Sequence, residues 1–512
     1  MKAVVAGAGV GGLAAAVRLA AAGHRVVVLE RAQRPGGKAG RLELAEGFRF
    51  DTGPSLLTMP WVLRDLFAAT GAPLEEELEL LRVEPVTRYR FADGSQVDLS
   101  ADLPVALEAL EAWSPGTGAD WMGFLGVCAG MWRAAVPFLT GPPPWPPRRP
   151  AAGEAAPDPR DALRVRPWHT LRSLARGCTR DPRLRTIIER FATYAGADPR
   201  RAPAALAIAG YVEHAFGAWH PRGGLHELVR ALVRRLEALG GELHCGCEVL
   251  GLSVAPGRRH AVRVTGAVTA QGLQTCDVLV SNLEPEVTRA LLARGAPALT
   301  GERLADRVMP TRAEGIPAGR TRAGDDPSVS GLALMLALHG RPDDLVHHRI
   351  AFPADYDAEF DDVLVHRRPA REPTVYLSSS CATDPGEAPG GGENLYVLVN
   401  APGEAGQDWA AEEERVLDRL AAVGWDPRPR LVARARRSPG DLERETGATR
   451  GHIYGQVAPH GRLMGSLRRP GNRSRDADGL WLVGGAVHPG GGLPLVMLGA
   501  QIVAREIGPA TG

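Results

Sequence analysis

The sequence predicts an α/β fold in which a Rossmann-like dinucleotide-binding domain is built from discontinuous segments and a second domain combines a mixed sheet with helices. Three observations predict it. The chain begins with strand, glycine turn, helix and strand in one unit at residues 2–30. Short apolar strands without alternation, as a buried parallel sheet requires, return at residues 277–282 and 479–485. A chain of 512 residues is also long enough for more than one domain.

A nucleotide-binding fingerprint occupies the start of the chain. The turn after the first predicted strand fits G-x-G-x-x-G and has one further glycine inside it: Gly7, Gly9, Gly11 and Gly12. These glycines allow a tight turn, close approach of a pyrophosphate, and contact between helix and strand, while the helix N-terminus attracts phosphate. The second strand ends at Glu30, where a carboxylate can accept hydrogen bonds from ribose hydroxyls. A glycine-rich turn that binds no nucleotide is the alternative interpretation.

A second glycine pair helps to choose the nucleotide. It is flanked by two cations within the segment Arg34, Pro35, Gly36, Gly37 and Lys38. Backbone N–H groups beside cations form a second anion site, suited to the far side of a diphosphate. In this position the segment resembles the R-x-G-G-[RK] element of FAD enzymes, so it favours FAD over NAD; an ordinary Pro-Gly turn is the alternative.

Composition excludes several classes of protein. The chain has 60 Lys and Arg against 59 Asp and Glu, a net charge of +1, so no nucleic-acid partner is expected. Six cysteines are sparse, and Cys245 and Cys247 have no second pair to complete a zinc site, so no metal is expected and the thiols are expected to be free in a reducing cytoplasm. The apolar N-terminus is interpreted as the first strand rather than a signal peptide.

The middle of the chain alternates predicted strands and helices. The stretch 89–97 alternates around Asp93-Gly94, a strong hairpin signal. Paired strands are expected at 242–254 and 261–268. The remaining predicted strands are 47–51, 331–339, 374–380 and 395–400, and the predicted helices are 61–70, 223–239 and 409–423.

Residues 100–215 are predicted to be mainly helical, interrupted by a proline-rich linker at 141–159. The stretch 121–132 carries no charge, and at about a dozen residues it is too short to span a bilayer. Aromatic residues gather here: Trp121, Phe124, Trp132, Phe138 and Trp145. Two interpretations stay open, a surface that dips into a membrane and a core helix.

The C-terminal end predicts a second site. A buried strand at 479–483 meets Gly484 and Gly485, a glycine-rich turn contains His488 and Pro494, and a helix follows at 495–507. A strand, a glycine turn and a helix N-terminus form a second site for an anion or a carbonyl group. His488 is a weak candidate for a polar contact near a flavin, and a structural histidine is the alternative.

Six stretches together resemble, in order, the landmarks of bacterial carotenoid desaturases of the phytoene desaturase family. They are residues 7–38, 51–55, 218–224, 277–282, 451–455 and 482–494. The resemblance covers nearly the whole chain and is poor at about 100–190. Where that family usually has Thr-His-Pro-Gly-Ala-Gly, this chain has His-Pro-Gly-Gly-Gly-Leu-Pro at 488–494, which is more similar to the hydroxycarotenoid 3,4-desaturase branch.

The resemblance implies non-covalent FAD, an amine oxidase/GDI-type fold and a substrate domain that faces the membrane. The FAD domain is expected at residues 1–70, 222–290 and 455–512, with Gly53 and Pro54 among its cofactor contacts, and the substrate domain at 71–221 and 291–454. With no predicted spanning segment and an aromatic cluster at 121–145, the protein is expected to be cytoplasmic and bound peripherally to the inner face of the membrane. The resemblance implies that it takes a carotenoid. The implied reaction is desaturation at C-3,4 of a 1-hydroxy carotenoid.

Flavin carries the difficult chemistry of desaturation, so no dense catalytic constellation is needed, and none stands out in the sequence. Arg222 is expected to bind the cofactor or to cap the following helix. Three other functions stay open: phytoene desaturase, another flavin oxidoreductase of the amine oxidase or retinol saturase type, and a non-catalytic prenyl-binding protein. An aromatic content of 5% argues against the cage that amine oxidation needs.

Overall fold

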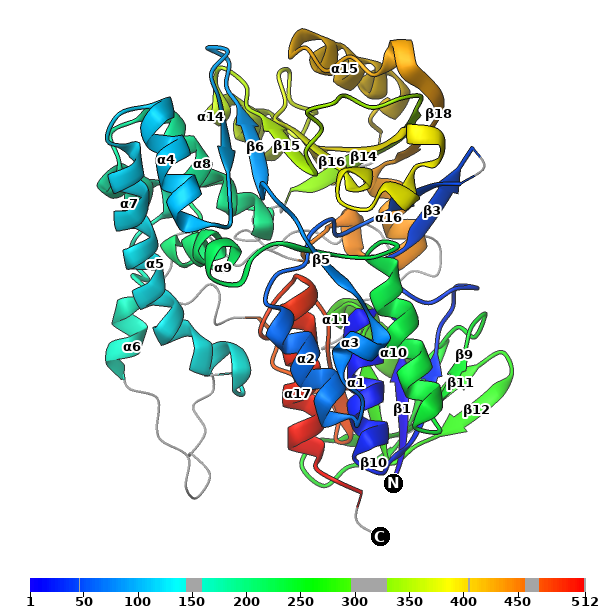
Figure 1. The fold of residues 1–512 in the computed structure, drawn as a ribbon. Helices are drawn as coiled ribbons and strands as arrows, with labels where there is room; N and C mark the ends of the chain where they lie inside the picture. Colours follow the sequence, from blue (N-terminus) through cyan, green and yellow to red (C-terminus); the bar gives the residue numbers. More distant parts are fainter. Residues whose placement is uncertain (46, 144–158, 296–328, 404–405, 456–468, 511–512) are drawn as a thin grey trace.

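A parallel sheet of five strands forms the nucleotide-binding half of the molecule in the computed structural model, which describes residues 1–512 except 46, 144–158, 296–328, 404–405, 456–468 and 511–512 (Figure 1). Its strand order is β19-β13-β1-β2-β9. The strands come from three distant parts of the chain: β1 Lys2–Ala6, β2 Arg25–Leu29, β9 Glu242–His244, β13 Val278–Ser281 and β19 Leu480–Leu482. The sheet is therefore assembled from discontinuous segments.

Both faces of this sheet are covered, which explains its unbroken apolar strands. Val5 and Val28 pack beneath three helices, α1 Val10–Ala21, α10 His226–Ala238 and α17 Leu493–Ile507. Val4 and Leu29 point the other way, against helix α11 Pro285–Gly295 and an antiparallel sheet. The strands of that sheet are β10 Gly251–Pro256, β11 Val262–Thr269 and β12 Gly272–Thr275.

The predicted strand at 242–254 is wrong as a single element. Residues 242–244 form β9 and pair in parallel with β2, whereas residues 251–256 form β10 and pair with β11. The chain turns between them at Gly246, whose φ is +67°. One stretch of sequence thus supplies two sheets.

A mixed sheet of seven strands organises the second half, in the order β18-β14-β17-β16-β15-β6-β7. Only β15 and β6 pair in parallel. The hairpin predicted around Asp93-Gly94 is confirmed, since Tyr89 on β6 lies opposite Val97 on β7. Helix α15 Trp409–Ala422 packs on one face through Val416 and Leu420. The strands are β6 Thr87–Arg90, β7 Gln96–Leu99, β14 Ser330–Leu338, β15 His348–Ala351, β16 Val375–Ser379, β17 Glu393–Ala401 and β18 Leu431–Arg437.

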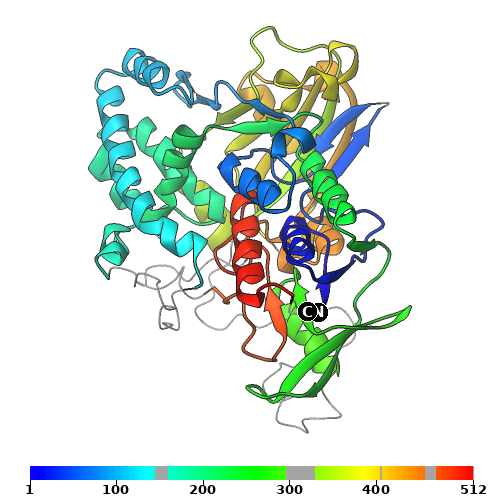
Figure 2. The ribbon, with the colours of Figure 1, turned by 60° about the horizontal axis from the view of Figure 1, so that its bottom comes forward.

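A layer of helices lies beside both sheets, and Figures 1 and 2 show it to one side of α17. Its helices are α4 Leu103–Trp113, α5 Thr117–Thr140, α6 Pro159–Arg164, α7 Leu171–Cys178, α8 Pro182–Glu189 and α9 Ile208–Phe216. Helix α17 contacts both α1 and α5 and so joins this layer to the parallel sheet. Most of the predicted proline-rich linker lies outside the described residues, as does Trp145.

Smaller elements complete the described chain. The strands are β3 Arg41–Leu44, β4 Phe48–Asp51, β5 Leu80–Arg82 and β8 Trp219–Pro221, and the helices are α2 Pro60–Ala69, α3 Leu74–Glu77, α14 Tyr356–Phe360 and α16 Pro439–Thr446. Single turns of 3₁₀ or π type are η1 Arg190–Ala195, η2 Ala204–Ala207, η3 Asp361–Val365, η4 Ser380–Ala382, η5 Pro385–Glu387, η6 Pro389–Gly391, η7 Arg428–Arg430 and η8 Thr449–Gly451.

Helix α5 is longer than its uncharged stretch indicated. It has 24 residues and, by length and composition alone, is the one helix of the described chain that could cross a membrane. Two of its aromatic residues nevertheless point inward: Trp121 is 1% exposed, Phe124 is fully buried, and the Trp121 indole donates a hydrogen bond to His214 Nε2 at 3.1 Å. Trp132 and Phe138 are half-buried and line the cavity described below. Because α5 packs against α4, α7, α9 and α17, we assign it to the core of the helical layer.

Candidate active site

A cavity of about 2170 Å³ lies where the parallel sheet, the seven-stranded sheet and the helical layer meet. It far exceeds the ~300–1,000 Å³ of an ordinary small-molecule pocket. Most residues predicted to bind the cofactor line it: Gly7, Gly9, Gly11, Glu30, Gly36, Gly37, Lys38, Gly53, Pro54, Gly484, Gly485 and Pro494. The structure thus brings together residues from both ends of the chain at the carboxyl edge of the parallel strands, where such sheets bind ligands.

The glycine turn after β1 leaves no room for side chains. A Cβ on Gly9 would lie 2.6 Å from the amide nitrogen of Asn282, and a Cβ on Gly11 would lie 2.8 Å from its amide oxygen. Gly12 does not line the cavity; a Cβ there would collide with the carbonyl oxygen of Gly7, so this glycine lets the helix touch the strand. The turn therefore presents bare backbone to the cavity.

The N-terminus of α1 offers free hydrogen-bond donors to this cavity. The first backbone bond of the helix runs from the N–H of Leu13 to the carbonyl of Gly9, and no side chain caps the helix. The N–H groups of the first turn, with the helix dipole behind them and no acidic residue within that turn of the helix, are an anion site. This geometry fits the diphosphate of a dinucleotide.

Glu30 stands at the rim of the same turn. Its Oε2 accepts a hydrogen bond from the N–H of Ala8 at 2.7 Å, and its Oε1 accepts one from the N–H of Ala32 at 2.9 Å. An ionised carboxylate has about four lone-pair positions, so it keeps capacity for ribose hydroxyls. Glu30 thus stabilises the turn and can also accept hydrogen bonds from ribose hydroxyls, as predicted.

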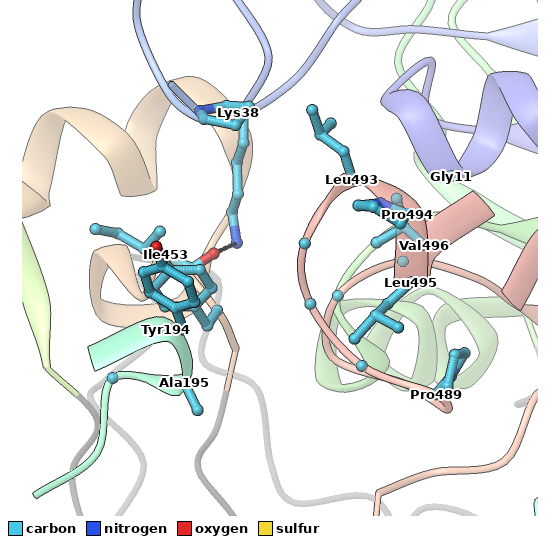
Figure 3. Close-up of a pocket in the computed structure, with 18 of the residues that line it drawn as sticks. Gly11, Lys38, Tyr194, Ala195, Ile453, Pro489, Leu493, Pro494, Leu495 and Val496 are labelled. Carbon is cyan, nitrogen blue, oxygen red and sulfur yellow. Dashed lines mark hydrogen bonds between the residues drawn. The ribbon is translucent and has the colours of Figure 1, made fainter. Parts of the chain in front are cut away.

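The second glycine segment packs directly on the first. The N–H of Gly36 donates to the carbonyl of Ala8 at 2.9 Å. The side chain of Lys38 reaches across the cavity wall, donating to the carbonyls of His452 at 2.9 Å and Ile453 at 3.1 Å, as Figure 3 shows for Ile453. Its Nζ also lies 3.6 Å from Glu284. Burial lowers the pKa of Lys38, while the Glu284 carboxylate opposes that shift. Lys38 is therefore already held by protein oxygens.

The C-terminal glycine loop forms the opposite wall of the cavity. Figure 3 shows residues 489–496 curving along it, facing Lys38 and Ile453. Helix α17 starts at Leu493 with no side-chain cap and no acidic residue in its first turn, so it presents a second free helix N-terminus. The predicted site for an anion or carbonyl group thus lies across the cavity from Lys38 and beside Gly11 of the first glycine turn, since α1 and α17 pack against each other.

Three residues singled out in the sequence lie away from the cavity wall. Arg34 is exposed on the surface. His488 is buried, its Nε2 donates to the carbonyl of Gly141 at 3.0 Å, and its ring packs edge-on against Phe138. Arg222 pairs with Glu79 on the surface at 2.6 Å. The contacts of His488 fit the structural alternative that the sequence left open. Arg222 pairs with Glu79 instead of capping the following helix, since no side chain caps α10.

Several residues of the cavity wall were not predicted from the sequence. Asn282 touches the glycine turn, Arg437 donates to the carbonyl of Thr52 at 2.6 Å, and Arg469 donates to the carbonyl of Gly485 at 2.5 Å. The sequence could have indicated Asn282, because this residue directly follows a buried parallel strand and ligands bind beyond the carboxyl ends of such strands. Arg437 lies 385 positions along the chain from Thr52, so no local pattern indicated it, and Arg469, 16 positions before Gly485, belongs to no motif of the sequence.

The chamber beyond the glycine turns is mainly apolar. Its walls carry Leu206, Ile208, Val212, Val329, Ile350, Phe352 and Leu398. Polar side chains also line it, and two hydrogen-bonded clusters stand out among them. In one, Arg190 pairs with Glu213 at 3.0 Å, and the Tyr194 hydroxyl donates to Glu213 at 2.5 Å. In the other, Ser55 and His348 are joined through the Tyr376 hydroxyl. Among the described residues no group of three or more His, Cys, Asp or Glu side chains could hold a metal ion.

Comparison with known proteins identifies the family. Residues 10–420 match the family described as flavin containing amine oxidoreductase, and the chain belongs to it. It is 34% identical to the hydroxyneurosporene desaturase of Rhodobacter capsulatus, over 98% of this chain and 97% of that protein. It is 31% identical to the 4,4'-diapolycopene oxygenase of Methylomonas, over 99% and 98% of the two chains. An oxidoreductase structure from Methanosarcina mazei shares the fold, with a TM-score of 0.63, 20% identity, and coverage of 99% and 100%.

These relationships and the fit of the site make the protein an FAD-dependent oxidoreductase of the carotenoid desaturase type. The glycine turn, Glu30 and the two free helix N-termini would hold FAD. FAD supplies a hydride acceptor for a CH–CH group. The apolar chamber of the chain would hold a long apolar ligand beside that acceptor.

Proposed function

We propose that the protein introduces a double bond at C-3,4 of a carotenoid whose end already carries a hydroxyl group at C-1. The observation that carries the proposal is the continuity of the cavity, in which one space of about 2170 Å³ contains both the dinucleotide cradle and an apolar chamber. A polyene in that chamber reaches the cradle with one end. The R. capsulatus relative is named for a hydroxylated carotenoid and matches over nearly full length, which favours the hydroxylated substrate.

The chamber also suits the charge changes of the reaction. Hydride loss leaves positive charge on the polyene, and a neighbouring proton must then depart. The Arg190–Glu213 pair and the Ser55–Tyr376–His348 group are the polar features described above on its walls. Burial lowers the pKa of His348 to about 3, so this imidazole is neutral at cellular pH and adds no positive charge beside the polyene.

Pigment analysis in reconstituted hosts tests the proposal. One host makes phytoene, and the other makes a 1-hydroxy carotenoid. We expect the hydroxylated pigment to gain one conjugated double bond, seen as a red shift of its absorption, while phytoene accumulates unchanged. Conversion of phytoene with the hydroxylated pigment left intact would contradict the proposal and support phytoene desaturase instead.

We also propose that the protein binds reversibly to the cytoplasmic face of the membrane and takes its substrate from the bilayer. Two side chains support this, Leu163 and Trp168, which line the cavity and are 55% and 60% exposed. An exposed aromatic and aliphatic mouth suits the interface of a bilayer. All six cysteines are free, which suits a reducing compartment.

Liposome flotation tests this surface. Changing both Leu163 and Trp168 to Ser should reduce the fraction of protein that floats, because the apolar contact is lost. Val365→Ser is the matched control, since Val365 is 65% exposed but does not line the cavity. Equal flotation of the double variant and the wild type would place the contact elsewhere, and wild-type protein that remains at the bottom would contradict membrane binding.

A further inference from the structure

Three side chains from distant parts of the chain form a hydrogen-bonded row on the cavity wall. Ser55 Oγ lies 2.5 Å from the hydroxyl oxygen of Tyr376, and that hydroxyl lies 2.8 Å from Nδ1 of His348. Ser55 follows β4 in the loop that holds Gly53, Tyr376 lies on β16, and His348 begins β15. All three line the cavity. We call Ser55, Tyr376 and His348 the hydroxyl row.

The hydroxyl row is left incomplete by the protein. His348 is 1% exposed, and its Nε2 has no hydrogen-bond partner among the residues that the structure describes. In a neutral imidazole one nitrogen donates and the other accepts. If Tyr376 donates to His348, then Nε2 carries the free donor. If His348 donates to Tyr376, then Nε2 is a free acceptor and the Ser55 proton is released toward other partners. In either direction one buried hydrogen-bonding position of the row is left without a partner among the described residues.

A neutral hydroxyl is the ligand group that fits this position. It donates and accepts, so it completes the row in both directions. A charged group would lose its hydration in an apolar chamber walled by Ile350 and Phe352. The nearby Arg190 cannot serve as its counter-ion without giving up Glu213. A plain hydrocarbon would leave the row unsatisfied.

The position of the row also agrees with the chemistry. A hydroxyl on C-1 is only two carbons from the C-3,4 bond, so its recognition site must adjoin the dinucleotide cradle. Ser55 directly follows Pro54 of that cradle, and Gly53 is in contact with the backbone of Lys38. We propose that Ser55, Tyr376 and His348 form a subsite that binds the hydroxyl group of the polyene end and sets substrate specificity. This inference rests on the proposed function.

Binding and turnover measured with FAD-loaded protein test the subsite. The probes are two polyenes of equal length, one with a 1-hydroxyl group and one without, and Kd is followed by the polyene absorbance. We expect the wild type to bind the hydroxylated polyene more tightly by roughly five- to hundredfold, as expected for a buried hydrogen-bonding group left unpaired by the hydrocarbon. Tyr376→Phe and His348→Phe should reduce that preference to about twofold or less by weakening only the hydroxylated polyene.

Two further variants keep the test decisive. Ser55→Ala should also lower the preference, and it removes the smallest side chain of the row. Tyr396→Phe is the matched control, because Tyr396 lines the same cavity from β17 without belonging to the row. It should keep the wild-type preference. Equal FAD content in every variant shows that folding is intact.

The outcomes separate the subsite from the proposed reaction. If the wild type prefers the hydroxylated polyene and the row variants keep that preference, the subsite is wrong while the proposed function stands. If the row variants lose the preference but the wild type forms its double bond elsewhere than C-3,4, the subsite stands and the proposed reaction is wrong. A wild type with no preference contradicts both.

Discussion

Substitution of Gly53 by Ala probes how tightly the cofactor cradle is packed. A Cβ at this position would collide with the carbonyl oxygen of Lys38, and even the Lys38 carbonyl carbon would lie at 2.9 Å, where ordinary contact begins at 3.4 Å. Both partners are backbone, so the two segments must move apart. Overpacking of this kind costs about 1–3 kcal/mol. Because both segments line the cavity, we expect the Kd for FAD to rise roughly five- to hundredfold.

Flavin fluorescence titration of the apoprotein measures this change. Gly123→Ala is the control, because Gly123 lies on the exposed face of α5 and no atom of the described residues would lie within 4 Å of its Cβ. It should leave the Kd for FAD unchanged, and better helix propensity should stabilise the protein slightly. A Gly53→Ala variant that binds FAD within about twofold of the wild type would refute the overpacking argument.

Three further predictions concern buried polar groups. Burial raises the pKa of Glu359 from 4.5 to about 7, so the contribution of this side chain to stability is present below pH 4.5 and is lost as pH rises through 7. In urea unfolding, the free energy of unfolding of Glu359→Gln should rise relative to that of the wild type by roughly 1–3 kcal/mol between pH 5 and pH 8. A difference between the two proteins that does not change with pH would contradict this. His488→Leu should lower the free energy of unfolding by about 1–3 kcal/mol, because the hydrogen bond to the carbonyl of Gly141 is lost. It should keep kcat within about threefold of the wild type. A much larger loss of kcat in folded, FAD-loaded protein would show that His488 is catalytic. Arg190→Met should lower the free energy of unfolding by about 3–5 kcal/mol, because buried Glu213 loses its counter-ion and keeps only the Tyr194 hydroxyl. Adding Glu213→Gln should restore part of that loss; a double variant no more stable than the single one would contradict the pairing.

The nucleotide-binding half was predictable because its signals are local. The strand at 2–6, the glycines of the turn and Glu30 lie within one short unit, and each residue type has one physical task there. The strand at 278–281 was predictable for the same reason, since a parallel strand buried on both faces shows an unbroken apolar run. Pairing partners were not predictable, so residues 242–254 were assigned to one strand although they serve two sheets.

The directions of the side chains were the part of the site that the sequence could not predict. Trp121, Phe124 and Cys128 recur at helical spacing and face the core. Their spacing therefore favoured a core helix, whereas the number of aromatic residues also suggested a membrane surface. The contact between Ser55 and Tyr376 joins residues 321 positions apart, and His488 is fixed by a carbonyl 347 positions away. Contacts at such separations depend on the whole fold, which local patterns do not report.

Reduction of bound FAD under anaerobic conditions tests the central claim most directly. Purified FAD-loaded protein is mixed, in separate experiments, with liposomes that carry a 1-hydroxy carotenoid or phytoene, and the flavin and polyene spectra are recorded together. The account predicts that the hydroxylated carotenoid bleaches the flavin while its own absorption shifts to the red, and that phytoene does neither. Bleaching by phytoene with no response to the hydroxylated carotenoid would contradict the account.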